Sequence, residues 1–236
     1  MQTQKNMKRA AQVSTPGKKR KVVAKKTSKK SFYAVPRPLT QYKTGFPKQL
    51  AITHKYTGGH QLSWTSPNAN VEYVPYGVNC LYDPYLFAGG GQPLYFDQLA
   101  AIYNHYTVMK ARIKATIVPN RNEAFVGGIY IDDDSSPAVT ALDVVNQQPS
   151  AVYKVSQRDA EVLTVYKSWD CKSVFGPNPM DNDRLQGDVA TNPAEFQSFI
   201  VYARPVLTVT PTTVFDVYIT IEFDTVWNEL KVMPGS

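Results

Sequence analysis

Cysteine is scarce in this sequence, and long apolar runs are missing. The 236 residues include only two cysteines, Cys80 and Cys171, which are too few for a framework of disulfides. No apolar stretch approaches the roughly 18 residues that a membrane-spanning helix needs. The N-terminus also lacks the apolar segment of a secretory signal. We therefore expect a soluble protein that is made in a reducing compartment and does not insert into a membrane.

Acidic residues are absent from the first 71 residues. This part of the chain contains fifteen Lys or Arg and no Asp or Glu, whereas residues 72–236 contain eleven Lys or Arg and nineteen Asp or Glu. The formal net charge of +7 therefore combines a basic N-terminal part with an acidic body. Such an asymmetry indicates a polyanionic partner that is held by the basic part.

The sequence also lacks the motifs of enzymes and metal sites. His54, His60 and His105 match no metal-ligand spacing, and neither cysteine has neighbours that would activate its thiol. The glycines at 89–91 are not followed by the Lys-Ser or Lys-Thr pair of a phosphate-binding loop. We find no nucleophile elbow and no placed acid–base couple, so we predict a protein that is not an enzyme and has no cofactor.

Asp132, Asp133 and Asp134 are the one candidate for a metal site. Adjacent carboxylates in a loop supply the hard oxygen ligands that Ca²⁺ prefers. Consecutive side chains diverge, however, and no Gly or Glu completes a known calcium loop. The alternative, a solvated acidic turn, is favoured, and we predict no metal.

The N-terminal arm, residues 1–45, is rich in lysine and poor in apolar groups. It cannot bury enough surface to offset its conformational entropy, so we expect it to be disordered alone. Lysine lacks the planar fork with which arginine reads bases, so we predict phosphate neutralisation with little sequence preference. The predicted nucleic-acid-binding residues are Lys5, Lys8, Arg9, Lys18, Lys19, Arg20, Lys21, Lys25, Lys26, Lys29 and Lys30. No aromatic residue for base stacking precedes Phe32.

The same arm contains a candidate nuclear import signal. Pro16–Val22 reads PGKKRKV and closely resembles the monopartite signal of polyomavirus large T antigen. Its basic residues are Lys18, Lys19, Arg20 and Lys21. The resemblance implies a nuclear import receptor as partner and a stay in the host nucleus. A solvated tail without a role is the remaining alternative.

Residues 46–236 are predicted to form one β domain. Alternation with period two is clearest in Thr213–Thr225 and in Thr107–Val118, where Lys110, Arg112 and Lys114 share one face. That face is either solvated or a basic patch that touches a packaged genome. The other predicted strands are Lys48–Tyr56, Val71–Leu81, Phe125–Asp132, Ala151–Val155, Val162–Trp169 and Phe196–Arg204.

Two short helices are predicted between these strands. Asp97 is expected to cap a helix through Tyr103, and Thr140–Asp143 resembles a capping box for a helix to Gln147. Eight strands with two helical insertions favour a jelly roll of two four-stranded sheets. An immunoglobulin-like sandwich is the alternative. Aromatic and Met residues in the loops are expected to form contacts between subunits; they are Tyr82, Tyr85, Phe87, Trp169, Phe175 and Met180.

One segment carries a specific resemblance. Gln92–Val108, together with Asn79–Pro84 and Arg112–Thr116, resembles coat proteins of small circular single-stranded DNA viruses, the circovirus-like, Rep-encoding group. In that group the segment lies between the third and fourth strands. The Lys-rich arm differs from the Arg-rich arm of circoviruses proper, which favours a relative of the group.

The resemblance implies a capsid protein whose single jelly roll assembles into a small T=1 icosahedral shell in the virion. Its partners would then be copies of itself and a single-stranded DNA genome, with RNA not excluded. The alternative function is that of a cellular nuclear nucleic-acid-binding or chaperone protein with a β-sandwich core and a basic tail.

Overall fold

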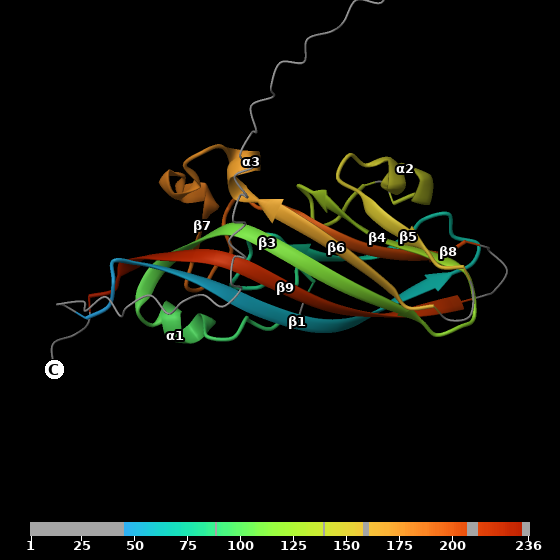
Figure 1. The fold of residues 1–236 in the computed structure, drawn as a ribbon, viewed down its shortest axis with the longest axis horizontal. Coiled ribbons are helices and arrows are strands. Elements are labelled where there is room, and N and C mark those ends of the chain that lie inside the picture. Colours follow the sequence, from blue (N-terminus) through green and yellow to red (C-terminus); the bar gives the residue numbers. More distant parts are fainter. Residues whose placement is uncertain (1–44, 88, 139, 158–160, 207–211, 233–236) are drawn as a thin grey trace, which may run out of the picture. The chain divides into compact units, whose positions relative to one another are not determined.

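Two antiparallel β-sheets packed against each other form the body of the protein (Figure 1). The computed structural model describes residues 45–87, 89–138, 140–157, 161–206 and 212–232. The five-stranded sheet has the order β1-β9-β3-β6, with β7 also paired to β3, and the four-stranded sheet has the order β2-β8-β4-β5. The strands are β1 Gln49–Thr65, β2 Glu72–Gly77, β3 Tyr103–Pro119, β4 Phe125–Asp132, β5 Val152–Val155, β6 Leu163–Asp170, β7 Gln186–Asp188, β8 Ser198–Pro205 and β9 Thr212–Leu230.

The order of these strands is that of a jelly roll. β1 pairs with β9, β2 with β8, β3 with β6 and β4 with β5, all antiparallel. The pairing is therefore nested, and the chain changes sheet at each of these strands except between β4 and β5. This arrangement confirms the predicted eight-stranded jelly roll and excludes the immunoglobulin-like alternative. The three-residue β7 is an additional strand.

Alternation along β9 explains the hydrophobic core. Phe215, Val217, Ile219, Ile221 and Phe223 are all buried, as the sequence pattern predicted. They pack with the inward side chains of β3 and with those of the four-stranded sheet in one large cluster. Burial of each such side chain contributes about 1.5–3 kcal/mol, so this interface between the sheets supplies most of the hydrophobic stabilisation.

The four-stranded sheet is buried on its other face as well. A second cluster there contains Val71, Val126, Tyr130, Val145, Ile200 and Tyr202. Val145 belongs to α2, Leu142–Gln147, and the Tyr202 hydroxyl donates a hydrogen bond to Asn146 Oδ1 at 2.7 Å. Because α2 covers this face, β4 and β8 are apolar at nearly every position and show no clear alternation.

The predicted helices exist, but neither predicted cap is present. α1 spans Phe96–Ala100, and its N-cap is Tyr95 rather than Asp97. The N-cap of α2 is Ala141, and no side chain caps it, so the predicted capping box is wrong. The chain enters α1 through a left-handed residue, Tyr95, with φ 68°, and this entry takes the place of a side-chain cap.

A further helical region was not predicted. α3 spans Cys171–Phe175 and is capped by Asp170, whose side chain accepts a hydrogen bond from the Lys172 backbone N–H at 3.0 Å. Two 3₁₀ turns follow at Pro179–Asp181 and Asp183–Leu185. Each is too short to show helical periodicity in a sequence. Among the described residues, no helix is both long and apolar enough to cross a membrane.

Several strand boundaries also differ from the prediction. β1 continues through Gly58 and Gly59 to Thr65, because it pairs with β9 along its whole length. β2 ends at Gly77, where the Cys80 side chain fills the space that a Cβ atom would occupy. Residues 92–102 lie between β2 and β3, the second and third strands, and residues 103–108 begin β3, so the segment does not lie between the third and fourth strands.

His54 connects α1 to the five-stranded sheet. Its Nε2 accepts a hydrogen bond from Trp227 Nε1–H at 3.0 Å, so the ring proton lies on Nδ1 and is donated to the Leu94 carbonyl oxygen, also at 3.0 Å. Burial lowers the pKa of His54, and the bond to Leu94 opposes this effect only in part. The neutral ring therefore fixes the loop that precedes α1.

Candidate nucleic-acid interface

The arm residues predicted to bind nucleic acid lie outside the described residues. They are Lys5, Lys8, Arg9, Lys18, Lys19, Arg20, Lys21, Lys25, Lys26, Lys29 and Lys30, and they include the whole predicted import signal. Their roles, and the predicted disorder of the arm, stay predictions. The structure does describe the candidates in the body, Lys110, Arg112 and Lys114 on β3 and the acids at 132–134.

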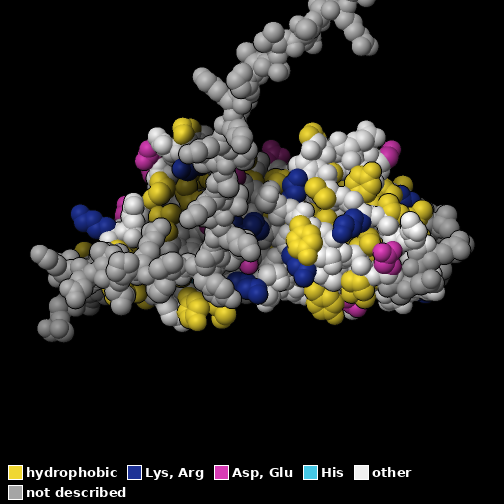
Figure 2. Space-filling model, viewed as in Figure 1, with side chains coloured by type: hydrophobic (Ala, Val, Ile, Leu, Met, Phe, Trp, Pro, Cys, Tyr) yellow, Lys and Arg dark blue, Asp and Glu magenta, His cyan; other side chains and the backbone are white. Residues whose placement is uncertain are grey.

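The outer face of the five-stranded sheet is exposed to solvent. Buried and exposed positions alternate along β1, β3, β6 and β9, so one row of side chains from each strand points outward. Figure 2 shows Lys and Arg side chains spread over this face beside hydrophobic side chains. This face is therefore the one place in the described body where charged and aromatic groups from four strands are presented together.

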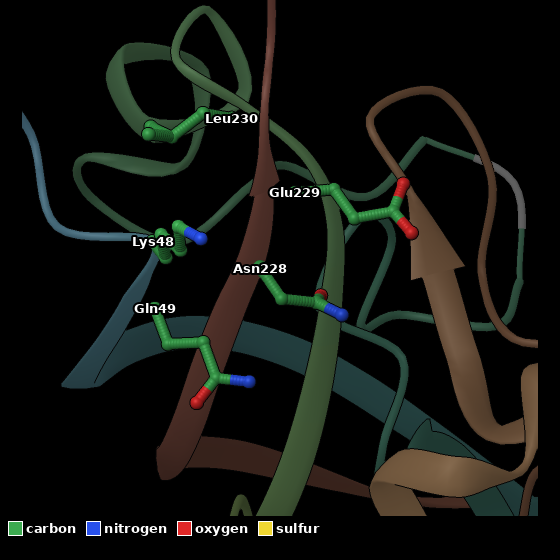
Figure 3. A pocket seen from close by; sticks show the side chains of 5 residues that line it. All are labelled: Lys48, Gln49, Asn228, Glu229 and Leu230. Carbon is green, nitrogen blue, oxygen red and sulfur yellow. The ribbon is translucent and has the colours of Figure 1, made fainter.

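An open hollow of about 610 Å³ lies where β1 begins and β9 ends (Figure 3). Lys48, Gln49, Asn228, Glu229 and Leu230 line it. Glu229 has a left-handed backbone, with φ 57°, and its carboxylate lies 3.3 Å from Nε2 of His105. The lining brings together the opposite charges of Lys48 and Glu229 and the amides of Gln49 and Asn228.

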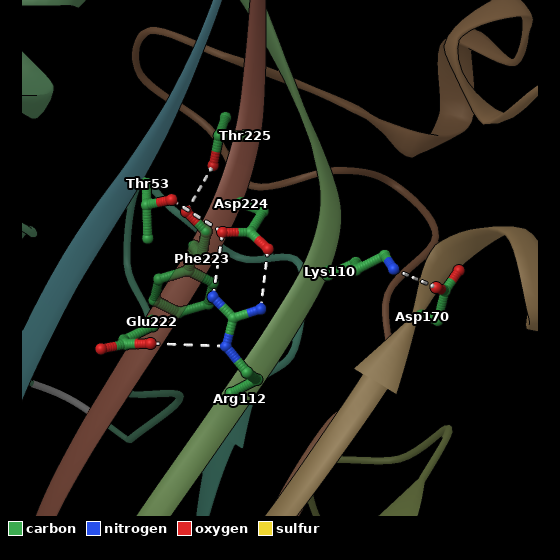
Figure 4. A network of polar contacts seen from close by, with 8 residues as sticks. All are labelled: Thr53, Lys110, Arg112, Asp170, Glu222, Phe223, Asp224 and Thr225. Atoms are coloured by element: carbon green, nitrogen blue, oxygen red, sulfur yellow. Dashed lines mark hydrogen bonds and ion pairs between the residues drawn. The ribbon is translucent and has the colours of Figure 1, made fainter. Parts of the chain in front are cut away.

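An ion-pair network occupies one half of the exposed sheet face (Figure 4). Arg112 binds Asp224 with two nitrogens, Nη1 to Oδ2 at 2.8 Å and Nη2 to Oδ1 at 3.0 Å. Its Nε reaches Glu222 Oε2 at 3.3 Å. On the other side, Lys110 Nζ lies 3.1 Å from Asp170 Oδ2. These contacts join β9, β3 and β6 across the sheet.

The network changes the acidity of its members. Hydrogen bonding from Lys110 lowers the pKa of Asp170. At Asp224, desolvation is the largest single effect and acts to raise the pKa, but the bonds from Arg112 and Thr53 together lower it. The bond to Asp224 in turn raises the pKa of Arg112. The charged forms of Asp170, Asp224 and Arg112 are thus favoured at neutral pH.

These contacts divide the predicted basic patch into two parts. Lys110 and Arg112 are neutralised by carboxylates on neighbouring strands, which favours the solvated-face interpretation for them. Lys114 makes no ion pair with any described residue. The sequence placed all three cations on one face correctly, but their partners come from β6 and β9, which are distant in the chain.

Asp132 is the last residue of β4, and Asp133 and Asp134 follow it, with a bend at Asp133. Asp132 Oδ1 accepts a hydrogen bond from the backbone N–H of Asp134 at 3.1 Å. Desolvation, followed by the neighbouring carboxylates, raises the pKa of Asp132. No group of three or more His, Cys, Asp or Glu side chains among the described residues is arranged to hold a metal ion. The geometry therefore favours an acidic turn over a Ca²⁺ site.

Both cysteines are buried and free. Burial raises the pKa of the Cys80 thiol, and it raises that of Cys171 to about 11. Neither is a thiolate near neutral pH, so neither has the activated form that a nucleophile needs.

Most of the loop aromatics expected at subunit contacts point inward instead. Trp169 is buried, and Tyr82, Tyr85 and Phe175 pack against the core. Only Phe87, at 39%, counts among the exposed large apolar side chains. The predicted contact residues did not include three exposed tyrosines in strands, Tyr153 on β5, Tyr166 on β6 and Tyr218 on β9. The period-two pattern of β9 already placed Tyr218 on the outer face, whereas β6 showed no comparable signal.

No protein-family model matches the sequence, and no curated protein matches it. Among solved structures, the chain aligns with viral capsids. A decameric BFDV capsid protein is 12% identical over 77% of this chain and 99% of its own, with a TM-score of 0.43. The semi-empty virus-like particle of the giant freshwater prawn Macrobrachium rosenbergii nodavirus is 12% identical. The alignment covers 82% of this chain and 100% of the nodavirus chain, with a TM-score of 0.45. Desmodium yellow mottle tymovirus aligns at 13% identity over the full length of both chains, with a TM-score of 0.35.

These neighbours are structural proteins of different virus groups, and the BFDV protein has been solved as a decamer and as a 60-mer. Because the TM-scores are low, the assignment of the jelly roll rests on the strand order of this chain itself. The neighbours do not single out the circovirus-like group.

Proposed function

We propose that this chain is a viral coat protein that assembles with copies of itself into an icosahedral shell and packages single-stranded nucleic acid. One observation carries the proposal: a strongly basic segment without any acid is joined to an acidic jelly-roll body. A fold alone does not define a function, because one fold serves many. The separation of charge indicates the function, because it provides a basic tail that can bind a polyanionic partner. The body then needs no basic surface of its own for this purpose.

The arm would act by neutralising phosphates. Residues 1–30 contain eleven Lys or Arg. Sixty copies, the number of general positions in the simplest icosahedral shell, would bring on the order of 660 positive charges to the packaged strand. An extended arm of about 30 residues reaches roughly 100 Å, at about 3.3 Å per residue. Charges of one sign repel each other, so the arm should oppose assembly until nucleic acid or salt screens it.

The proposal extends to single-stranded DNA as the genome and to the host nucleus as the place of assembly. The support is the PGKKRKV segment and the resemblance of residues 92–108 to coat proteins of the circovirus-like group. Replacing Lys18, Lys19, Arg20 and Lys21 together with Ala in a fluorescent fusion of residues 1–35 should leave the fusion in the cytoplasm. Unchanged nuclear accumulation would place the signal elsewhere.

Electron microscopy of the purified protein tests the main proposal. We expect regular shells that protect nucleic acid from nuclease. If the arm neutralises about eight to eleven phosphates, log K for single strands should fall with log salt at a slope near −6 to −8. A protein that binds with this slope but never forms particles would instead be a cellular nucleic-acid-binding or chaperone protein. A slope near zero would refute packaging by the arm.

Deletion of residues 1–40 separates the arm from the body. The hydrophobic core is built from residues 50 and beyond, so the truncated chain retains all of it. We expect empty shells that assemble at lower salt than the full chain requires in the absence of nucleic acid. Size-exclusion chromatography would decide, and a truncated protein that stays monomeric at every salt concentration would show that the arm is needed for assembly.

A further inference from the structure

Two exposed tyrosines flank Lys114, the cation of β3 for which the described part of the chain holds no carboxylate partner. The register pairs Lys114 with Tyr166 on β6 and with Thr220 on β9, and Tyr218 is the next outward residue along β9. Directly paired residues on one sheet face have Cβ atoms about 5 Å apart, and diagonal neighbours about 7–8 Å. Tyr166, Lys114 and Tyr218 therefore form one continuous patch, which we name the tyrosine–lysine patch.

The aromatic rings of this patch are available to a ligand. Tyr166 is 61% exposed and Tyr218 is 58% exposed. Neither ring contacts another aromatic ring among the described residues, whereas many core aromatics make tilted or edge-to-face contacts. A Cβ atom on Gly59 would lie 3.5 Å from Tyr218 Cδ1, so the Tyr218 ring lies close over the bare backbone of β1. A ring that lies along the sheet presents its other face to solvent.

A hollow of about 260 Å³ adjoins Tyr218. It is lined by Gly59, His60, Gln61, Asp216 and Tyr218. Gln61 Nε2 donates a hydrogen bond to Asp216 Oδ1 at 2.8 Å, so the far wall carries an acceptor and a negative charge. A phosphate is repelled from this wall and attracted to Lys114 on the opposite side of Tyr218. The side of the patch near the hollow is thus suited to a nucleic-acid base, and the side near Lys114 is suited to a phosphate of the nucleic-acid backbone.

The surroundings also favour a nucleic acid over a protein. The outward neighbours in the same rows are small hydroxyl residues, Thr57, Thr116, Thr164 and Thr220. They keep the surface flat and offer hydrogen-bond donors to phosphate and sugar oxygens, but they supply little of the apolar area that the core of a protein interface needs. Beyond them, Lys110 and Arg112 are already paired with carboxylates, whereas Lys114 makes no ion pair with any described residue and lies directly beside Tyr166.

We propose that the tyrosine–lysine patch binds single-stranded nucleic acid, with bases stacked on Tyr166 and Tyr218 and a phosphate paired with Lys114. The proposal rests on the proposed packaging function and adds what the arm lacks. The arm has no aromatic residue before Phe32, so it can neutralise phosphates but not stack bases. Stacking on aromatic side chains is tolerant of sequence, as packaging of a whole genome requires.

The test uses the full-length chain and a fluorescent oligothymidylate over a range of salt concentrations. The double variant Tyr166→Ala/Tyr218→Ala should bind about fivefold or more weakly at every salt concentration, with the salt slope unchanged, because tyrosine releases no counterion. Lys114→Gln should reduce the slope by about 0.7. Matched controls are Tyr153→Ala, an exposed tyrosine on β5 of the other sheet, and Lys110→Gln, whose charge is already paired with Asp170. Neither control should change affinity or slope.

Photocrosslinking of the wild-type chain gives a readout that does not depend on how the variants fold. With bromodeoxyuridine in the strand, we expect crosslinked peptides that contain Tyr166 and Tyr218. Crosslinks confined to residues 1–44, with the double variant binding like Tyr153→Ala, would overturn this inference and leave arm-mediated packaging intact. A wild-type slope near zero would instead refute the packaging function. If the double variant blocked assembly while binding normally, the patch would be a contact between subunits and the inference would be wrong.

Discussion

The two sheets of the jelly roll share one core but differ in their outer faces. The four-stranded sheet is covered by α2 and its loops, and Ile200, Tyr202 and Tyr130 are buried there as fully as the residues between the sheets. No helix among the described residues covers the central rows of the outer face of the five-stranded sheet, and the outward residues there include ion pairs, threonines and tyrosines. Packing therefore restricts both faces of one sheet but only one face of the other. Side chains on the outer face of the five-stranded sheet can therefore bind a ligand without disturbing the packing of the core.

The largest expected effect is a fall in the free energy of unfolding when the cover over the outer face of the four-stranded sheet is disturbed. Tyr202→Ala removes a buried ring and its hydrogen bond to Asn146, so we expect the free energy of unfolding to fall by about 3–5 kcal/mol. Chemical denaturation of the unassembled chain measures this. Gly128→Ala should also destabilise, because its Cβ would lie 2.5 Å from the Tyr202 ring. A loss below 1 kcal/mol in both variants would show that α2 does not seal this face.

The second effect concerns the attachment of α1 to the five-stranded sheet. His54→Ala leaves the Trp227 N–H and the Leu94 carbonyl without partners, each at a cost of about 1–3 kcal/mol. The folded state lowers the pKa of His54, so unfolded chains bind more protons below about pH 6.5. Stability of the wild type should therefore fall as the pH drops from 7 towards 5.

Urea unfolding at several pH values checks this prediction. The variant lacks the titrating ring, so the difference in stability between wild type and His54→Ala should shrink as the pH falls. A difference that stays constant between pH 7 and 5 would mean that His54 does not titrate differently on folding.

A smaller effect is expected from the ion-pair network on the exposed face. Arg112→Ala should cost about 1 kcal/mol or less near neutral pH, because the network is partly exposed. The folded state lowers the pKa of Asp224, so the contribution of this pair is present above about pH 4 and is lost as the pH falls through the folded pKa. The Asp224 pKa, followed by NMR, should rise in the variant. Lys114→Ala, on the same strand face but without an ion-pair partner, is the control and should leave it nearly unchanged.

The smallest effect is expected at the exposed tyrosines. Tyr218→Ala should change the free energy of unfolding by less than about 0.5 kcal/mol, since the ring is 58% exposed and contributes nothing to the core. The contrast with Tyr202→Ala, measured in the same denaturant series, tests the difference between the two sheets. If both variants lost the same free energy of unfolding, the outer faces of the two sheets would not differ in their contribution to stability.

Much of the fold was accessible from local pattern. Period-two alternation placed the inward residues of β9 correctly and those of β3 from Ala111 onward, and β4 was predicted with its observed bounds, Phe125–Asp132. A register shift between Val108 and Lys110 buries Val108 where the pattern placed Met109 inward. The errors occur where a neighbour overrides a local signal. The predicted strand Lys48–Tyr56 stops short, because pairing with β9 carries β1 through Gly58 and Gly59 to Thr65. Asp97 suggested a cap, but the left-handed Tyr95 begins α1 instead.

The sequence by itself determined the separation of a basic arm from an acidic body, the β class, and the face of β3 that carries Lys110, Arg112 and Lys114, because charge and period-two alternation are local properties of a chain. Only the tertiary structure decided which of these cations is neutralised. Asp170, Glu222 and Asp224 lie 60–112 residues away in the chain from the cations of β3 that they neutralise. The same pairing placed Tyr166 and Tyr218 beside Lys114. Side chains meet across a sheet according to strand order and register, and both are set by burial of the whole core rather than by any one segment.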